Sequence, residues 1–176
     1  MTKLILEIGP RDFGMYKACA RVKKQLTNGE AEYLALDCQL IQLQTVIRDH
    51  MQAIIGNLKQ LPFADGSIDE IWLFNVFSGI TNEKNGIWPS NPLPYIQEIA
   101  RTIKRGSHII IGEYMTRTGP LTDGLKTIDY RSLGILPTIF EGPNFSQFIK
   151  DQELDHQAIQ KQIREDNPFF LDLHKT

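Results

Sequence analysis

Short apolar runs alternate with segments of helical periodicity along this chain, and this alternation constrains the fold more than any other feature. The run from Lys3 to Ile8 ends in Gly9-Pro10, and the run from Tyr33 to Leu36 leads into Asp37. Between them, the segment from Asp12 to Thr27 places apolar residues on one helical face. Successive strand and helix units of this kind are typical of α/β proteins with a mostly parallel sheet.

The same pattern continues toward the C-terminus. Helices are expected over residues 40–47, from Leu93 to a stop at Gly106, and, as a polar solvated helix, from Asp151 to Asp166. Further strands are expected at residues 53–55, 71–74, 108–112, 135–140 and 169–173. We therefore predict a Rossmann-like sheet of seven mostly parallel strands flanked by helices. Trp72 and Phe169-Phe170 are expected to pack in its core.

Composition limits the classes of protein that this chain can belong to. Its 176 residues, 41% hydrophobic and 23% charged, predict a single globular domain spanning residues 1–176. The 19 basic and 21 acidic residues are scattered, so no nucleic-acid partner is expected. No apolar run approaches the roughly 20 residues that span a bilayer, and no signal-peptide layout is present, so we expect a cytoplasmic protein without a membrane partner. Cys19 and Cys38 are expected to be reduced and buried.

The first two expected strands end in residues that can bind a polar ligand. Gly9 and Gly14 flank the turn between the first strand and its helix, where backbone amides can receive a polar group. Asp37 ends the second strand, where an acid can accept hydrogen bonds from both hydroxyls of a ribose. The alternative for each position is a purely structural role. Gly9 would then serve a tight turn and nothing else, and Asp37 would simply cap the following helix.

A later block resembles a known family. Residues 56–72 read GNLKQLPFADGSIDEIW, which is similar to the GDAxxLPFxDxSFDxV stretch of class I S-adenosylmethionine-dependent methyltransferases. Residues 6–14, LEIGPRDFG, resemble the LEIGxGxG loop of that family. The segment from Tyr95 to Glu113, which contains EIAR and KRG, resembles EIxRVLKPGGxxxI. The resemblance, to a type 11-like methyltransferase domain, covers approximately residues 3 to 115.

The resemblance implies a methyltransferase whose cofactor is S-adenosylmethionine. It places the glycine loop against the methionine part of the cofactor, the acid at the end of the second strand against the ribose, and the turn after the third strand against the adenine. The end of the fourth strand closes the site. The residues implied are Glu7, Gly9, Arg11 and Gly14 for the methionine part, Asp37 for the ribose, Asn57 and the Leu58 amide for the adenine, and Phe74 and Asn75 for the closing wall.

The glycine loop departs from the family pattern. Arg11 and Phe13 replace two of its three glycines, Gly14 is displaced by one position, and Asn57 stands where the family has Asp. Arg11 either blocks the methionine end or reaches the cofactor carboxylate with its guanidinium. Two hypotheses therefore stand, an active methyltransferase and a catalytically inactive methyltransferase-like binding or interaction domain. A nicotinamide-dependent oxidoreductase would also use Gly9 and Asp37, but it has no counterpart to residues 56–72.

The acceptor side is less constrained. Residues 75–78 lack the NPPY motif of enzymes that methylate amines of nucleic-acid bases, so we expect a small-molecule acceptor. The lid is expected from residues 79–94, from residues 114–130, or from a partner in a homodimer. Glu113, Tyr114 and Asp129 lie near this edge, but none is assigned as a general base. The four histidines have no metal-ligand spacing, so no metal site is expected.

Overall fold

The fold is a seven-stranded sheet in the order β3-β2-β1-β4-β5-β7-β6. The computed structural model describes residues 2–10, 14–74, 76–77, 91–114, 120–140, 143–155 and 168–176. Strands β1 to β5 pair in parallel, and β7 runs antiparallel to both β5 and β6. The predicted seven-stranded, mostly parallel α/β fold is therefore confirmed. The strands are β1 (Lys3–Ile8), β2 (Ala31–Asp37), β3 (Gln52–Ile55), β4 (Ile68–Phe74), β5 (Ile103–Tyr114), β6 (Ile135–Phe140) and β7 (Pro168–Lys175).

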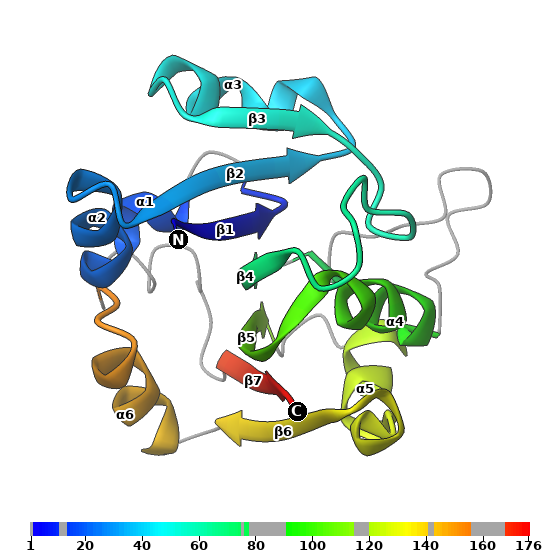
Figure 1. Cartoon of the computed structure of the whole chain (residues 1–176). Helices are drawn as coiled ribbons and strands as arrows, with labels where there is room; N and C mark the ends of the chain where they lie inside the picture. The colour runs from blue at the N-terminus through cyan, green and yellow to red at the C-terminus, as the bar shows by residue number, and fades with distance from the viewer. Residues whose placement is uncertain are drawn as a thin grey trace.

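Helices cover the sheet on both faces (Figure 1). One apolar cluster joins the sheet to α1, α2, α3 and α6, and the other joins its opposite face to α4 and α5. Trp72 and Phe170 are fully buried in the first cluster, which confirms the predicted core packing of these two residues, whereas the side chain of Phe169 lies outside the described part of the chain. The helices are α1 (Met15–Ala18), α2 (Ala20–Thr27), α3 (Leu40–Arg48), α4 (Leu93–Thr102), α5 (Pro120–Thr127) and α6 (Pro143–Asp151), with a 3-10 turn, η2 (Tyr130–Leu133).

The helix predicted over residues 12–27 is interrupted at Cys19. This residue has extended backbone angles and forms an isolated bridge with Leu154. On either side of it, Asp155 donates its backbone N–H to Ala18 and Ala20 donates to Glu153, at 2.7 and 3.0 Å. The chain after α6 therefore holds Cys19 out of the helix. This contact joins residues that are far apart in the sequence, so local periodicity gave no sign of it.

The helix that begins at Leu93 ends at Thr102, before the predicted stop at Gly106. The backbone N–H groups of Gly66 and Ser67 donate to the carbonyls of Arg101 and Thr102, both at 2.9 Å. Ile103 is already paired with Ile68 at the start of β5. The loop before β4 thus satisfies the last helical carbonyls and starts the next strand directly.

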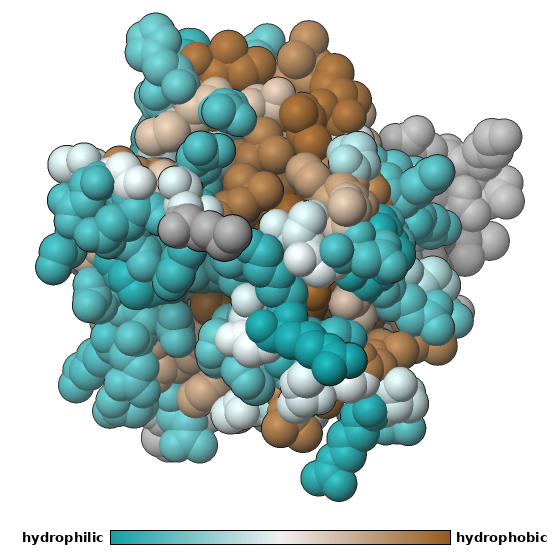
Figure 2. Space-filling view, in the orientation of Figure 1, coloured by the Kyte–Doolittle hydropathy of each residue, from teal (hydrophilic) through white to brown (hydrophobic). Residues whose placement is uncertain are grey.

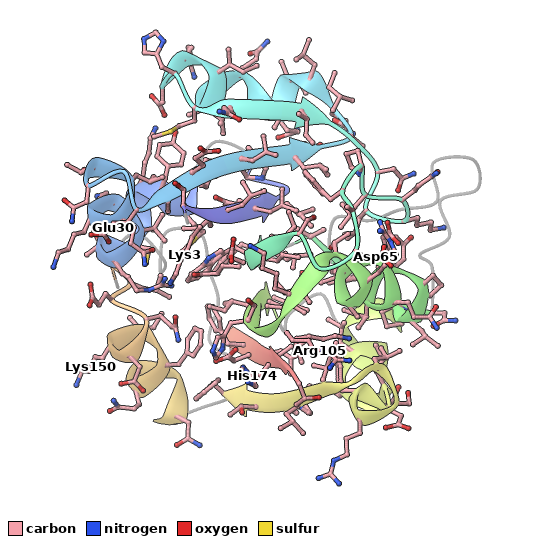
Figure 3. All side chains as sticks on the ribbon, in the orientation of Figure 1. Lys3, Glu30, Asp65, Arg105, Lys150 and His174 are labelled. Atoms are coloured by element: carbon pink, nitrogen blue, oxygen red, sulfur yellow. The ribbon has the colours of Figure 1, made fainter. Side chains whose placement is uncertain are left out.

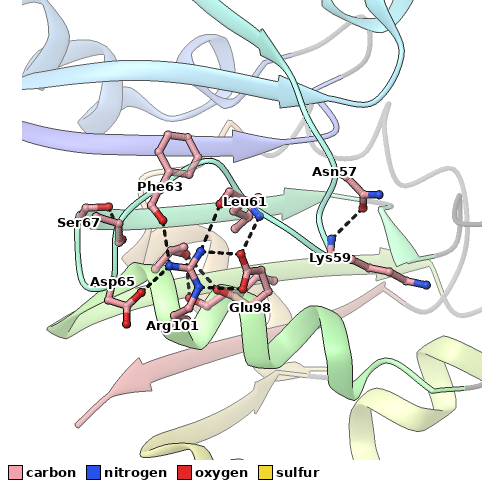
Figure 4. Close-up of polar contacts among 11 residues, drawn as sticks. Asn57, Lys59, Leu61, Phe63, Asp65, Ser67, Glu98 and Arg101 are labelled. Atoms are coloured by element: carbon pink, nitrogen blue, oxygen red, sulfur yellow. Dashed lines mark hydrogen bonds and ion pairs between the residues drawn. The ribbon is translucent and has the colours of Figure 1, made fainter.

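Arg101 holds this loop in place from α4 (Figure 4). Its guanidinium donates to the carbonyls of Phe63 and Leu61 at 2.9 and 3.2 Å, and to the Asp65 carboxylate at 2.5 Å. It also donates to Glu98, which accepts the Leu61 N–H at 2.7 Å. The hydrogen bonds from Arg101 hold the pKa of Glu98 below its usual range. The two segments 56–72 and 95–113 are therefore one interlocked unit.

The C-terminal part differs from the helix predicted over residues 151–166. Helix α6 ends at Asp151, and Gln152 to Leu154 turn away from it. Phe148 and Ile149 are buried, and the Phe148 ring lies 4.8 Å from that of Phe170. The expected start of the helix at Asp151 is therefore wrong, because Asp151 ends α6, whose Phe148 packs on β7. Residues 156–166 of the prediction lie outside the described residues.

The two cysteines differ in burial. Cys19 is buried in the core beneath α1 and α2, as predicted. Cys38 is exposed, so the prediction of burial is wrong there, because the residue lies in the turn between β2 and α3. Within the described ranges, no helix has the length and apolar character needed to cross a membrane.

Replacement of Arg101 should destabilise the fold through the loop before β4. Arg101→Met removes the donor to Glu98, Asp65 and two loop carbonyls, so we expect the free energy of unfolding to fall. Urea denaturation measures this change. The matched control is Arg105→Met, since Arg105 is exposed and its side chain lies away from Asp65 (Figure 3). Equal losses in the two variants would contradict the role given to Arg101.

Candidate functional site

The ends of the parallel strands meet at one edge of the sheet. Ile8 at the end of β1 pairs with Leu36 of β2 and Leu73 of β4. The ladder continues beyond the strands, because Gly9 donates to the Leu36 carbonyl at 2.8 Å and Gly56 donates to that of Asp37 at 2.9 Å. The predicted residues that follow β1, β2 and β3 are therefore brought to a common edge, where ligands of open α/β sheets bind.

Glu7 is buried beneath the first loop, with 1% of its surface exposed. Its carboxylate accepts the backbone N–H of Met15 at 2.6 Å and the hydroxyl of Tyr33. Burial raises the pKa of Glu7 from 4.5 to about 7, against the two hydrogen bonds, which lower it. Glu7 therefore connects β1 to the first residue of α1 and to β2. These contacts fix the start of α1 relative to the end of β1.

Gly9 and Gly14 are both in close contact with the protein itself. Gly9 has a φ of 70°, and a Cβ built there would lie 2.9 Å from Cγ2 of Val76. A Cβ at Gly14 would clash with the Tyr16 ring and lie 3.0 Å from the Tyr33 hydroxyl. Both positions thus require glycine for conformation or packing. Arg11 of the same loop lies outside the described residues.

Asp37 is half-buried at the end of β2. Its Oδ1 accepts the backbone N–H of Gln39 at 2.8 Å, which shapes the turn into α3. The N-cap of α3 is Gln39, so Asp37 shapes the turn without capping the helix itself. One carboxylate oxygen is thus engaged in the turn, at the strand end where the ribose contact is predicted.

Asn57 and Leu58 lie in a tight turn directly after β3. Asn57 is exposed, its Oδ1 accepts the N–H of Lys59 at 2.9 Å, and its carbonyl accepts the N–H of Gln60 at 2.9 Å. Leu58 is 7% exposed and packs in the same cluster as Leu36. The turn therefore presents a polar residue and an apolar wall beside the end of β2.

The end of β4 is aromatic and apolar. Phe74 is 9% exposed, stacks on Trp72 at 5.9 Å and meets Phe170 edge to face at 5.6 Å. It belongs to the cluster on the α1 and α2 face. Asn75, the second predicted residue here, lies outside the described residues.

The acids considered as bases both have structural partners. Glu113, 1% exposed, accepts the backbone N–H of Phe77 at 2.8 Å and so ties the end of β5 to the chain after β4. Asp129 is exposed and accepts the N–H of Ser132 at 3.4 Å as the N-cap of η2. The side chain of Tyr114 lies outside the described part of the chain. Both described acids therefore hold backbone N–H groups in place.

Sequence reasoning missed the tyrosines around the first loop. Tyr33 binds Glu7, and its ring meets that of Tyr16 edge to face at 5.0 Å. Tyr16 in turn donates to Asp49 at the end of α3, which also pairs with Lys17 at 2.5 Å. Tyr33 faces Glu7 only because the parallel register sets Glu7 beside Ala35, a relation absent from the linear pattern.

The sequence matches the model of a known protein family. The family model described as a methyltransferase domain matches residues 6–111, more than half of the chain. The chain therefore belongs to this family of S-adenosylmethionine-dependent methyltransferase domains, whose cofactor is S-adenosylmethionine. No curated protein matches the sequence significantly.

Solved structures agree on the fold. A TehB-like S-adenosylmethionine-dependent methyltransferase from Corynebacterium glutamicum has 17% identity and a TM-score of 0.61, over 99% of this chain and 80% of that one. An S-adenosylmethionine-dependent methyltransferase from Aquifex aeolicus has 14% identity and a TM-score of 0.60, over 97% of this chain and 81% of that one. Phosphoethanolamine N-methyltransferase 2 from Haemonchus contortus, in complex with S-adenosylmethionine, has 12% identity and a TM-score of 0.61, over 99% and 49%.

The residues present fit the nucleoside part of this cofactor. A carboxylate at the end of β2 suits two ribose hydroxyls, and the apolar side chain of Leu58 suits a wall for an adenine ring. At the end of β1, the space that Gly9 leaves is taken by Val76, so this glycine serves the close packing of two loops. The fit is therefore carried by the ends of β2 and β3.

The buried carboxyl of Glu7 should make stability depend on pH. The folded state keeps this proton to a higher pH than the unfolded chain, so the free energy of unfolding should fall as pH rises from about 4.5 to about 7. The difference between the two pKa values corresponds to a loss of about 3 kcal/mol. Urea denaturation of wild type and Glu7→Gln across this range measures it. The amide cannot titrate, so the variant should lack this part of the slope.

Tyr33→Phe tests whether the titration of Glu7 causes this pH dependence. The Tyr33 hydroxyl lowers the pKa of Glu7, so its removal should extend the loss of stability to higher pH and make the total loss larger, while the loss still begins near pH 4.5. Identical pH profiles for wild type, Glu7→Gln and Tyr33→Phe would show that Glu7 does not titrate in this range.

Proposed function

We propose that the chain binds S-adenosylmethionine at this edge and transfers its methyl group to a small-molecule acceptor. The observation that carries the proposal is the position of Asp37, half-buried at the end of β2 and joined through its carbonyl to Gly56, next to the Asn57-Leu58 turn. An acid and an apolar turn at neighbouring strand ends match the two halves of a nucleoside.

In this proposal Asp37 accepts the ribose hydroxyls, and its contact with the Gln39 N–H keeps the carboxylate oriented. Asn57 and the Leu58 amide meet the polar edge of the adenine, while the Leu58 side chain lies against its face. Phe74 and Asn75 complete the wall at the end of β4.

The loop from Gly9 to Gly14 is proposed to hold the methionine part, with Arg11 turned toward the cofactor carboxylate. Glu7 supports this binding through the backbone: by holding Met15 it fixes the end of the loop at the start of α1. The sulfonium of the cofactor supplies an activated methyl group. The protein contributes binding, alignment in line with the acceptor, and exclusion of water.

A small acceptor is favoured over a polymer for two reasons. Basic residues are scattered along the sequence, with a net charge of -2, which gives no phosphate-binding patch. The segment after β4, residues 75–78, lacks the prolines and tyrosine of enzymes that methylate nucleic-acid bases.

An inactive binding domain is the second candidate, and the packing of the glycine loop favours it. Val76 fills the space at Gly9, and the Tyr16 ring fills that at Gly14. Side chains from α1 and from the chain after β4 that lie against both glycines leave less room for the methionine part. Cofactor binding separates the two candidates.

Isothermal titration with S-adenosylmethionine and S-adenosylhomocysteine tests the proposal directly. We expect binding of both, accompanied by thermal stabilisation of the protein. Asp37→Ala should weaken binding by about 1 to 3 kcal/mol through loss of the ribose contact. Asp37→Asn keeps an acceptor for the Gln39 N–H, so its affinity for the cofactor should lie between those of the wild type and Asp37→Ala. Asp151→Ala, on α6, is the control and should bind as wild type does.

Two outcomes would count against the proposal. Unchanged affinity in a folded Asp37→Ala variant would remove the ribose assignment. Absence of heat and of stabilisation at millimolar ligand would favour the inactive domain.

A further inference from the structure

Four large apolar side chains are exposed on α3 and β3. Leu40, Ile41 and Ile47 of α3 are 55%, 59% and 47% exposed, and Ile55 of β3 is 62% exposed. Figure 2 shows hydrophobic surface gathered over these two elements. We call these four residues the α3–β3 face.

Strand β3 is the outermost strand on its side of the sheet and pairs with β2. Its sequence, Gln52 to Ile55, has no charged residue and no proline, and none of its four residues is buried. Natural edge strands are usually protected by charge, proline or a covering element. The opposite edge, β6, has such protection, since it contains Pro137.

Helix α3 is also unusual for a surface helix. Its nine residues, LIQLQTVIR, carry a single charge, at Arg48. The neighbouring α2 instead carries Arg21, Lys23 and Lys24, as expected for a helix with a solvated face. Three of the five exposed residues of α3 are therefore large and apolar, beside Gln44 and Arg48.

We infer that the α3–β3 face is an interface with a second copy of this chain. A two-fold axis perpendicular to the sheet, at the outer edge of β3, sets the two β3 strands antiparallel and joins the two sheets into one. The same axis places both α3 helices on one face of this sheet, in antiparallel order. Such an interface uses the same surface twice.

The spacing of residues on α3 suits this symmetry. Leu40 and Ile47 are seven residues apart and so lie on one side of the helix. In antiparallel order, Leu40 of each copy meets Ile47 of the other. Ile55 of each copy then lies at the joined strands, where its apolar surface is covered.

The charge of the face favours a second copy over a charged partner. A two-fold interface brings each charge near its own image, which is unfavourable unless the surface is close to neutral. Between Leu40 and Ile47, and along β3, there is no charged residue. A nucleic acid or an acidic peptide would find no complementary group there. The inference does not depend on the proposed methyl transfer.

Sedimentation equilibrium of the full chain over a range of concentrations tests the inference. We expect a monomer–dimer equilibrium whose dissociation constant rises at least about tenfold in Ile55→Lys and in Ile41→Lys, because each places a charge in an apolar contact. The matched control is Ile139→Lys, on the opposite edge strand, where the residue is 45% exposed. It should leave the equilibrium unchanged. Circular dichroism confirms that each variant is folded.

Three results would overturn it. One is a wild-type chain that stays monomeric at all concentrations, and another is a dimer weakened by Ile139→Lys while Ile55→Lys has no effect. The third is a monomer that binds a different protein through Ile41 and Ile55, which would assign the face to a heterologous partner.

Discussion

The carboxyl group of Glu7, buried near the end of β1, ties three elements together at the edge where the parallel strands end. Glu7 binds the first residue of α1 and the hydroxyl of Tyr33, so β1, β2 and the first helix meet at one group. An acid with 1% exposure is costly to bury unless its oxygens are satisfied. The hydrogen bonds from Met15 and Tyr33 offset that cost, and they fix the start of α1 relative to β1 and β2.

On the other face of the sheet, the Arg101 guanidinium also holds backbone from separate segments together. Arg101 holds the loop before β4 through Leu61, Phe63 and Asp65, and this loop satisfies the end of α4. The sequence block with the clearest family resemblance is thus largely a structural element. Most of this block, residues 56–72, holds the loop before β4, and ligand contacts are proposed for Asn57 and Leu58 at its beginning. Similarity of this block is consequently better evidence for fold than for activity.

Local sequence patterns predicted the strands well and the helix boundaries less well. All seven strands lie where apolar runs were found. For the inner strands β1, β2 and β4 the reason is that a strand buried on both faces needs a short continuous apolar segment. The break at Cys19 and the end of α4 at Thr102 were not predictable in this way, since each depends on hydrogen bonds from a distant segment. The same holds for the site: Asp37 was visible as an acid ending a strand, whereas Tyr33 and Val76 were not.

The sequence by itself determined the α/β class, the family and the side of the sheet on which polar residues gather, since these depend on the order and spacing of residues along the chain. Only the tertiary structure decided which polar groups are engaged with the protein and which apolar groups remain uncovered. Glu7, Glu113 and Arg101 hold backbone, and Ile55 is left exposed at the outer strand. The physical reason is that burial and partnership depend on strand register and helix packing, which bring together residues far apart in the chain.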